Sequence, residues 1–212
     1  MMKNPRRPEE ISQVKEKILD HALDIIAKRG LDGLTMRKLG ASLSMTAPNI
    51  YNYFKCKEEI YLCLVIRGFE MLYAEMKRTY RRLDHAEKRA RAIVEAYMDF
   101  GISHPQYYGI MFTSPTPKYN DYVGTPFEPL SVRELKLSMQ IFRMAVDTAA
   151  AVMESSSNDP AVLRRVVRIW SLVHGMISLH NSHVIDYVCE SPETLFSEII
   201  DEVLNALKTP KG

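Results

Sequence analysis

Apolar residues recur at three- and four-residue steps along almost the whole chain, and this spacing restricts the fold more than any other feature of the sequence. The first run holds Ile11, Val14, Ile18, Ala22 and Ile25. These residues fall on one face of an α-helix, which turns once about every 3.6 residues. No stretch shows the strict alternation of apolar and polar residues that a half-buried strand requires. The pattern therefore predicts an all-α protein.

Glycine, proline and capping residues divide this pattern into separate helices. Gly30 ends the first helix, and Thr35 and Thr46 are the predicted N-caps of two short helices. Asp159 is the predicted N-cap of a later one, because Pro160 suits the first helical position. The predicted helices after the first cover residues 36–43, 47–54, 58–83, 86–103, 131–153, 160–182 and 192–208. A proline-rich break follows a short aromatic segment and separates two of these helices at 113–130, and breaks of this length are usually functional or disordered.

Charge is distributed unevenly along the 212 residues. Residues 1–57 hold eleven Lys or Arg and six Asp or Glu, a net charge of +5, which leaves −3 for the remainder. A basic head on an acidic body favours a polyanion as the partner of the head, although short stretches of one sign are also common. We expect a tail over 1–10, a helix-turn-helix domain over 11–57, a helical domain over 58–208 and a tail over 209–212.

Two short helices after a longer supporting helix are the arrangement of a helix-turn-helix, whose second helix enters the major groove of DNA. In the second short helix, Ile50 and Phe54 lie four residues apart and should face the core. Asn49, Asn52 and Tyr53 should then point outward. An Asn side chain can donate to and accept from an adenine edge. A plain three-helix bundle with a polar surface would show the same spacing.

The segment from Leu34 to Ile60 resembles the N-terminal signature of the tetracycline-repressor (TetR) family. Thr35 and Arg37 match the start of the family's second helix, and Thr46 stands where the family caps its recognition helix. The aromatic run from Tyr51 to Phe54 and the sequence Lys57-Glu58-Glu59 also match. The resemblance and the outward positions together predict this set of DNA-binding residues: Thr35, Arg37, Thr46, Pro48, Asn49, Tyr51, Asn52, Tyr53 and Lys57. Of these, Tyr51, Tyr53 and Lys57 suit phosphate oxygens.

Three positions depart from the family pattern. Gly40 stands where Ala is usual, Ser44 where a turn Gly is usual, and Cys56 where Ser is common. Gly inside a helix costs about 0.5–1 kcal/mol relative to Ala, and a left-handed backbone at Ser44 would be strained. None of the three removes a DNA-contacting side chain, but Gly40 and Ser44 lower the expected rigidity of the motif.

The helix around Trp170 carries two functional faces. Trp170, His174 and Asn181 lie on one face, and small residues occupy the neighbouring face. Small side chains let another helix approach closely, so two helices from each of two chains can form a four-helix bundle. The predicted dimer contacts are Ser171, Gly175, Ser178, Ser182, Phe196, Ile200 and Leu204. The spacing of Trp170, His174 and Gly175 also resembles a C-terminal subclass of the TetR family, the WHG type.

Met and aromatic residues are frequent in the helical body, and most are expected in its core. We expect some of them to line a cavity for a small, largely apolar effector, because Met and flat aromatic rings adapt to apolar ligands. The predicted ligand contacts are Tyr97, Phe100, Tyr107, Met111, Phe142 and His174. A lone His on an apolar face is more often a hydrogen-bonded core residue. The break at 113–130 is a candidate mobile wall of the cavity or a plain surface loop.

Other classes of protein fit the sequence less well. It contains no GxSxG, P-loop, HExxH or dinucleotide fingerprint, which argues against an enzyme, and we expect no cofactor. His180 and His183 lie one turn apart, but only Asp186 and Cys189 accompany them, so no metal site is expected. An interaction module without DNA binding is the remaining alternative, although it would not need basic and aromatic residues in register on a basic head.

The cysteines and the hydropathy indicate the compartment. Three cysteines without a CxxC pair suggest a reducing cytoplasm, and no apolar run is long enough to span a membrane. The sequence therefore predicts an all-α, cytoplasmic transcription regulator without a membrane partner. Its N-terminal helix-turn-helix precedes a helical ligand-binding and dimerisation domain. We expect a homodimeric repressor that binds double-stranded DNA at an inverted-repeat operator.

Overall fold

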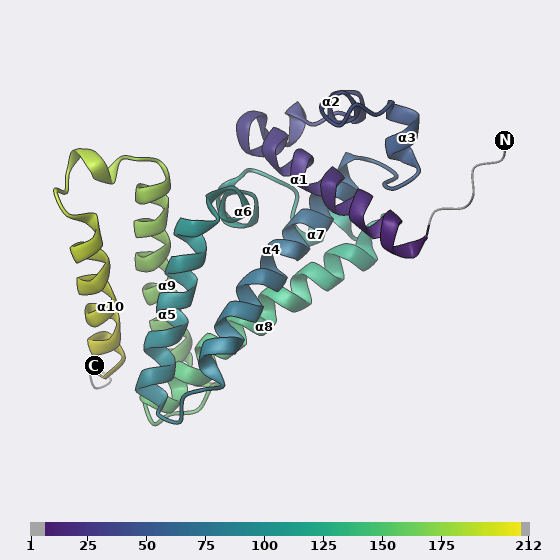
Figure 1. Ribbon diagram of the computed structural model, residues 1–212. Coiled ribbons are helices and arrows are strands. Elements are labelled where there is room, and N and C mark those ends of the chain that lie inside the picture. Colours follow the sequence, from purple (N-terminus) through teal and green to yellow (C-terminus); the bar gives the residue numbers. More distant parts are fainter. Residues whose placement is uncertain (1–6, 209–212) are drawn as a thin grey trace. The chain divides into compact units, whose positions relative to one another are not determined.

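The computed structural model describes residues 7–208, and within that range it contains helices and no strand (Figure 1). The all-α prediction is confirmed. The α-helices are α1 (Pro8–Gly33), α2 (Met36–Ser42), α3 (Ala47–Tyr51), α4 (Lys57–Tyr80), α5 (Ala86–Ser103), α6 (Pro105–Tyr108), α7 (Tyr119–Tyr122), α8 (Glu128–Val152), α9 (Pro160–Asn181) and α10 (Pro192–Lys208). A π-helix (Gly109–Thr113) follows α6, and a 3₁₀-helix (Ile185–Tyr187) precedes α10.

Local sequence signals set several of these boundaries. The Asp159 carboxylate accepts a hydrogen bond from the backbone N–H of Ala161 at 2.8 Å and so caps α9, with Pro160 at the first position as predicted. Gly30 takes φ 67° and ψ 175°, which interrupts the helical backbone of α1 where the sequence predicted its end. One further helical turn follows, up to Gly33. The predicted tails at 1–10 and 209–212 lie mostly outside the described residues, and α1 begins at Pro8.

The chain folds into two compact units, which we describe separately. Among the described residues, unit 1 contains residues 7–69 and 106–136, and unit 2 contains residues 70–105 and 137–208. The helices α4 and α8 each contribute to both units. The unit that contains the predicted DNA-binding head therefore also includes residues 58–69 and 106–136, which the sequence analysis assigned to the second domain.

Unit 1 is built around fully buried aliphatic side chains. Ile18 of α1, Leu39 of α2, Ile50 of α3 and Ile60 of α4 have no exposed surface, and α2 packs against both α1 and α3. Burying a side chain of this size contributes about 1.5–3 kcal/mol. These contacts fix the two short helices, which are too short to be stable alone.

The break predicted at 113–130 is partly helical and packs within unit 1. It contains α7, and α8 begins at Glu128 rather than at the predicted Ser131. The Tyr61 hydroxyl on α4 donates to the carbonyl of Ile110 at 3.2 Å and also contacts the Thr116 hydroxyl. The side chain of Tyr122 is buried. Buried aromatic side chains therefore hold this segment against the first half of α4.

Unit 2 has its own apolar core. Its helices α5, α9 and α10 pack against one another, and the second half of α8 completes the core. The buried core residues are Ala90, Val146, Ala149, Ala150, Val162, Val166, Leu204 and Leu207. The many alanines let the helices approach closely, because they add little volume between the helix axes.

Candidate functional site

The turn between α2 and α3 depends on Gly40. The Thr35 hydroxyl accepts from the backbone N–H of Lys38 at 3.2 Å and caps α2 as predicted. At the other end of α2, the carbonyl of Gly40 accepts from the N–H of Met45 at 2.8 Å. A Cβ on Gly40 would lie 2.7 Å from the Met45 carbonyl oxygen and 3.3 Å from the Ala47 nitrogen. Gly40 therefore permits the close turn, a role that the expected loss of rigidity did not take into account.

Ser44 occupies the left-handed position in this turn. Its φ is 54°, the conformation that the sequence analysis considered strained for a residue other than Gly. Such a backbone costs about 1–2 kcal/mol for an L-residue with a side chain. The turn is thus held by the packing of α2 and α3 and not by local preference at Ser44.

Helix α3 presents a polar surface around a buried anchor. Ile50 and Phe54 are buried as predicted, but the helix ends at Tyr51 and not at Phe54. Thr46 is the N-cap residue by position, although its side chain makes no capping hydrogen bond. The exposed side chains on α2, on α3 and beside them include Thr35, Arg37, Lys38, Thr46, Pro48, Tyr51 and Asn52. Most of the predicted DNA-binding residues are therefore available at one surface.

Tyr53 is the exception among these residues. Its side chain is only 8% exposed, so the ring lies against the interior of unit 1 beside Phe54. The prediction that Tyr53 points outward is wrong. Asn49 is half-buried, and its Oδ1 accepts from Nδ2 of Asn52 at 3.4 Å. The two amides that were expected to read bases therefore lie next to each other.

The basic residues of this surface differ in how firmly they are held. Lys38 Nζ donates to the carbonyl of Gly33 at 3.2 Å. Lys57 Nζ lies 3.4 Å from a carboxylate oxygen of Asp32, whose side chain is fully exposed. An exposed ion pair of this kind contributes about 0–1 kcal/mol, so a phosphate can replace Asp32 at little cost. Asp32 was not among the predicted site residues.

A second cluster of predicted site residues lies in unit 2. The indole Nε1 of Trp170 donates to the Tyr97 hydroxyl at 2.8 Å. The ring centroids of Phe142 and His174 lie 6.4 Å and 6.3 Å from that of Trp170. Burial lowers the pKa of His174, so its imidazole is neutral near pH 7. Three predicted ligand residues, Tyr97, Phe142 and His174, thus meet around Trp170. Trp170 itself was predicted to share a helix face with His174 but was not among the predicted ligand contacts.

The other predicted ligand contacts lie elsewhere. The ring of Phe100 in unit 2 packs against His104 with a centroid distance of 5.2 Å. Tyr107 and Met111 are buried in unit 1. A Cβ on Gly68 of α4 would lie 2.5 Å from Met111 Sδ and 3.1 Å from the Tyr107 ring. Tyr107 and Met111 therefore contact α4 directly.

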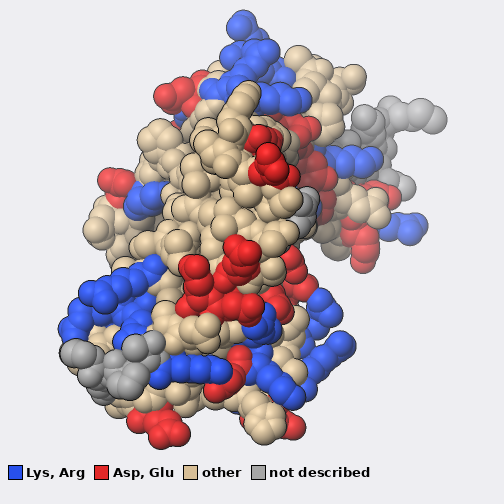
Figure 2. All heavy atoms as spheres, turned by 90° about the vertical axis from the view of Figure 1, so that its left-hand side faces the viewer, with Lys and Arg blue, Asp and Glu red and all other residues tan. Residues whose placement is uncertain are grey.

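The predicted dimer face on α9 is partly open in the single chain, although the hydroxyl of Ser178 is buried. Ser171 and Ser182 are exposed, and no atom lies within 4 Å of a Cβ placed on Gly175. Leu172 and Leu179 beside this row are 44% and 43% exposed. Figure 2 looks at the side on which α10 lies in Figure 1 and shows a broad uncharged area bordered by groups of charged side chains.

The predicted dimer contacts on α10 are partly used within the chain. Leu204 is buried in the unit 2 core, and Ile200 packs against that core. The ring of Phe196 lies 5.4 Å from the His180 ring of α9. The row on α9 is thus the more available part of the predicted interface.

Within residues 7–208, no three or more His, Cys, Asp and Glu side chains gather as a metal site would require. His183 pairs with Asp186 at 3.2 Å. No helix in the same range combines the length and the apolar character needed to cross a membrane.

Comparison with known families agrees with this arrangement. Residues 18–64 match the model described as bacterial regulatory proteins of the tetR family. Residues 90–203, more than half of the chain, match the tetracyclin repressor-like C-terminal domain. The chain belongs to the TetR family. The members of this family are DNA-binding transcriptional regulators, and dimerisation and a ligand-binding domain are typical of them.

Individual relatives are more distant. The regulator YobS of Bacillus subtilis is 29% identical over 100 residues, which cover 46% of this chain and 51% of that protein. The transcriptional activator FasR of Mycolicibacterium smegmatis is 28% identical over 110 residues, 52% of this chain and 48% of FasR. The chain thus spans about half the length of these two relatives. The crystal structure of the regulatory protein SCO4313 has the same fold, with a TM-score of 0.74 and 20% identity over 95% of this chain and 100% of that one.

Proposed function

We propose that this TetR-family protein is a repressor. It binds an inverted-repeat operator as a homodimer, and a small, largely apolar effector releases it. The observation that carries the DNA-binding part is the surface formed by α2 and α3. There, Arg37, Tyr51 and Asn52 are exposed around the fully buried Ile50. A short helix anchored on its inner side and polar on its outer side can enter a major groove without rearranging the core.

Operator binding is tested by selecting duplexes from a random pool and then measuring affinity at several salt concentrations. Two heads related by a twofold axis must meet major grooves about 34–36 Å apart or a multiple of that, so selected sites should contain an inverted repeat. Affinity should fall steeply with salt. Arg37→Ala should weaken binding, while Arg164→Ala, an equally exposed change on α9, should not. Selected sequences without a dyad would contradict the inverted repeat.

The second copy in the homodimer is proposed to dock on the exposed row of α9. Gly175 has open space around it, and the flanking Leu172 and Leu179 are half exposed. Past the end of α9, Tyr187 is 90% exposed and Val188 is also exposed. Large apolar side chains left exposed are typical of an interface, and a twofold axis lets one self-complementary face serve both copies.

The effector is proposed to bind at the aromatic cluster of Tyr97, Phe142, Trp170 and His174. Flat rings with one or two polar atoms are typical of pockets for small apolar molecules. Trp170 is 41% exposed in the single chain, although the rings of Phe142 and His174 lie beside its indole. A ligand over this ring would remove it from water and gain the free energy of that burial.

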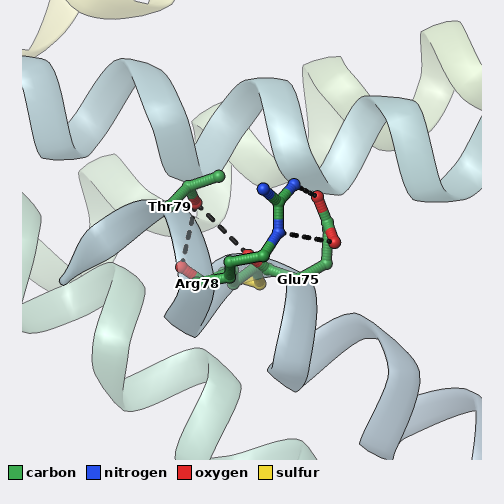
Figure 3. A network of polar contacts seen from close by, with 4 residues as sticks. Glu75, Arg78 and Thr79 are labelled. Carbon is green, nitrogen blue, oxygen red and sulfur yellow. Dashed lines mark hydrogen bonds and ion pairs between the residues drawn. The ribbon is translucent and has the colours of Figure 1, made fainter. Parts of the chain in front are cut away.

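Helix α4 is the proposed connection between effector and DNA. It begins at Lys57, directly after the DNA-binding surface, and runs without interruption to Tyr80. Its last turns are held locally, because Arg78 pairs with Glu75 and the Thr79 hydroxyl donates to the carbonyl of Met76 at 3.0 Å (Figure 3). A helix that stays regular to its end can tilt as one rod. A coupling free energy of about 1–3 kcal/mol between effector binding and DNA binding is sufficient for regulation. The coupling is reciprocal, so operator DNA must weaken effector binding by the same factor as the effector weakens DNA binding.

Activation of transcription is the second candidate outcome, because the relative FasR is an activator. A reporter gene under the selected operator separates the two. A repressor lowers reporter expression in the absence of effector, whereas an activator raises it. The variant Arg37→Ala should abolish either effect, which ties the outcome to DNA binding.

A further inference from the structure

Unit 2 contains a small apolar cavity next to the aromatic cluster. Its volume is about 50 Å³, and residues of α5, α8, α9 and α10 line it. The lining residues are Ala90, Ile93, Val94, Ala145, Thr148, Ala149, Val166, Ile169 and Leu207. Thr148 is the only polar residue among them, and its hydroxyl donates to the carbonyl of Met144 at 2.7 Å. No polar group in the lining therefore needs a water partner.

The cavity lies one helical turn from the aromatic cluster on three different helices. On α5, Val94 lines the cavity and Tyr97 belongs to the cluster. On α9, Val166 lines the cavity and Trp170 follows four residues later. On α8 the order is reversed, with Phe142 in the cluster and Ala145 in the cavity lining. Residues three or four apart share a helix face, so the cavity and the cluster face the same interior and adjoin each other.

We propose that this cavity is a subsite for the slender alkyl end of the effector, whose other end lies against Trp170 and His174. The inference rests on the proposed effector site and specifies the shape and chemistry of its ligand. An apolar cavity of about 150 Å³ stays dry and binds benzene. A cavity one third that size fits a few methylene groups and excludes a ring or a branched end.

Small side chains are what keep this space open. Ala145 and Ala149 lie on α8, and Ala90 faces them from α5. A larger residue at any of these positions would fill the space, as Leu and Val do elsewhere in the same core. An alkyl chain that enters the cavity gains about fourfold in affinity for each methylene removed from water.

The test uses straight-chain primary alcohols from butanol to dodecanol, with binding to the full-length protein measured by calorimetry and thermal stabilisation. In the native protein, affinity should rise about fourfold per methylene until the cavity is full. Ala149→Val should remove the gain in affinity from the last methylenes of the series, and so weaken the longest bound alcohols about tenfold. Ala151→Val is the matched control, because Ala151 lies on the exposed side of the same helix. It should bind the series as the native protein does.

A second variant keeps the test decisive if Ala149→Val does not fold. Val166→Ala enlarges the cavity, so it should bind alcohols with a branched end, which the native protein should reject. Identical chain-length series for Ala149→Val and Ala151→Val would overturn the inference. So would unchanged selectivity in Val166→Ala, since the space would then be only a packing defect.

The measurement separates this inference from the proposed function. Alcohol binding is measured without DNA, so the chain-length series shows by itself whether the cavity binds an alkyl chain. Operator release by the same alcohols is measured afterwards. If the native protein selects no operator, the proposed function fails. The alcohol series then still shows whether the cavity binds an alkyl chain.

Discussion

The Trp170 indole N–H donates a hydrogen bond to the Tyr97 hydroxyl at 2.8 Å, and this bond joins α9 to α5 in unit 2. It fixes the plane of the Trp170 ring between Phe142 and His174. The proposed effector site is thus arranged before a ligand arrives. Preorganisation of this kind reduces the cost of binding, because fewer side chains have to be ordered.

Breaking that bond should destabilise the protein moderately. Trp170→Phe and Tyr97→Phe each remove one partner and keep an aromatic ring. We expect each to lower the free energy of unfolding by about 0.5–1.5 kcal/mol. The double variant should lose less than the sum, because the bond can be lost only once. Urea unfolding of the four proteins gives the coupling, and strictly additive losses would show that the bond contributes nothing.

Acid should destabilise the native protein partly through His174. Burial lowers the pKa of His174 in the folded protein, so the unfolded chain binds the proton more readily. Stability due to the neutral imidazole is complete above the ordinary histidine pKa, about 6.5. It is lost as the pH falls from there to the folded pKa. His174→Gln should make the acid side of a stability–pH curve shallower, whereas the exposed His85→Gln should not. Equal slopes in both variants would contradict this assignment.

Gly40 should not tolerate Ala, although Ala is the usual residue at this position in the family. The added Cβ would lie 2.7 Å from the Met45 carbonyl oxygen, which is backbone and cannot rotate away. The gain of about 0.5–1 kcal/mol in helix propensity is smaller than the overpacking cost of about 1–3 kcal/mol. We expect Gly40→Ala to lower the melting temperature and weaken DNA binding. Gly109→Ala is the control, since its Cβ would meet only Thr113 Oγ1 at 3.9 Å. A stabilised Gly40→Ala would show that the turn can move.

Residues of the DNA-binding surface should divide by role. Asn49→Ala or Asn52→Ala should change the preferred base at one position by about 1–3 kcal/mol, if the amide contacts a base edge in two places. Tyr51→Phe and Lys57→Ala should weaken binding to all sequences alike, because phosphate contacts carry no sequence information. Binding-site selection with each variant distinguishes the two groups. Identical profiles for both groups would refute the division.

The sequence predicted elements with strong periodicity well and local backbone geometry poorly. The bounds of α5 and α10 follow from apolar spacing together with the prolines at 105 and 192, because one buried face determines each helix and proline marks where it can end or begin. The role of Gly40 could not be predicted, since it depends on how closely the backbone of the α2–α3 turn approaches Gly40. Periodicity within one helix does not report that distance. The inward turn of Tyr53 was missed for a related reason. The helix was extended by periodicity to Phe54, whereas the fold ends it at Tyr51.

The candidate sites show the same limit. Trp170 shares a helix face with His174, and that much is visible in the sequence. Its hydrogen bond to Tyr97, 73 residues away, depends on how α9 packs on α5. The cavity beside the cluster depends on several alanines from two helices facing one another, and no spacing within a single helix encodes it. Long-range packing is thus what the sequence pattern leaves open.

The row of small residues on α9 provides a test of the dimer that does not disturb the chain's own core. No atom lies within 4 Å of a Cβ on Gly175, so a large side chain fits the folded single chain. Between two helices in close contact, the same side chain would force the helices apart. Gly175→Leu should therefore keep its helical circular dichroism but form monomers or aggregates in size-exclusion chromatography with light scattering. Ala151→Leu, on the exposed side of α8, should remain a dimer. A dimeric Gly175→Leu would place the interface on another face, and the exposed Leu172 and Leu179 would then need a different explanation.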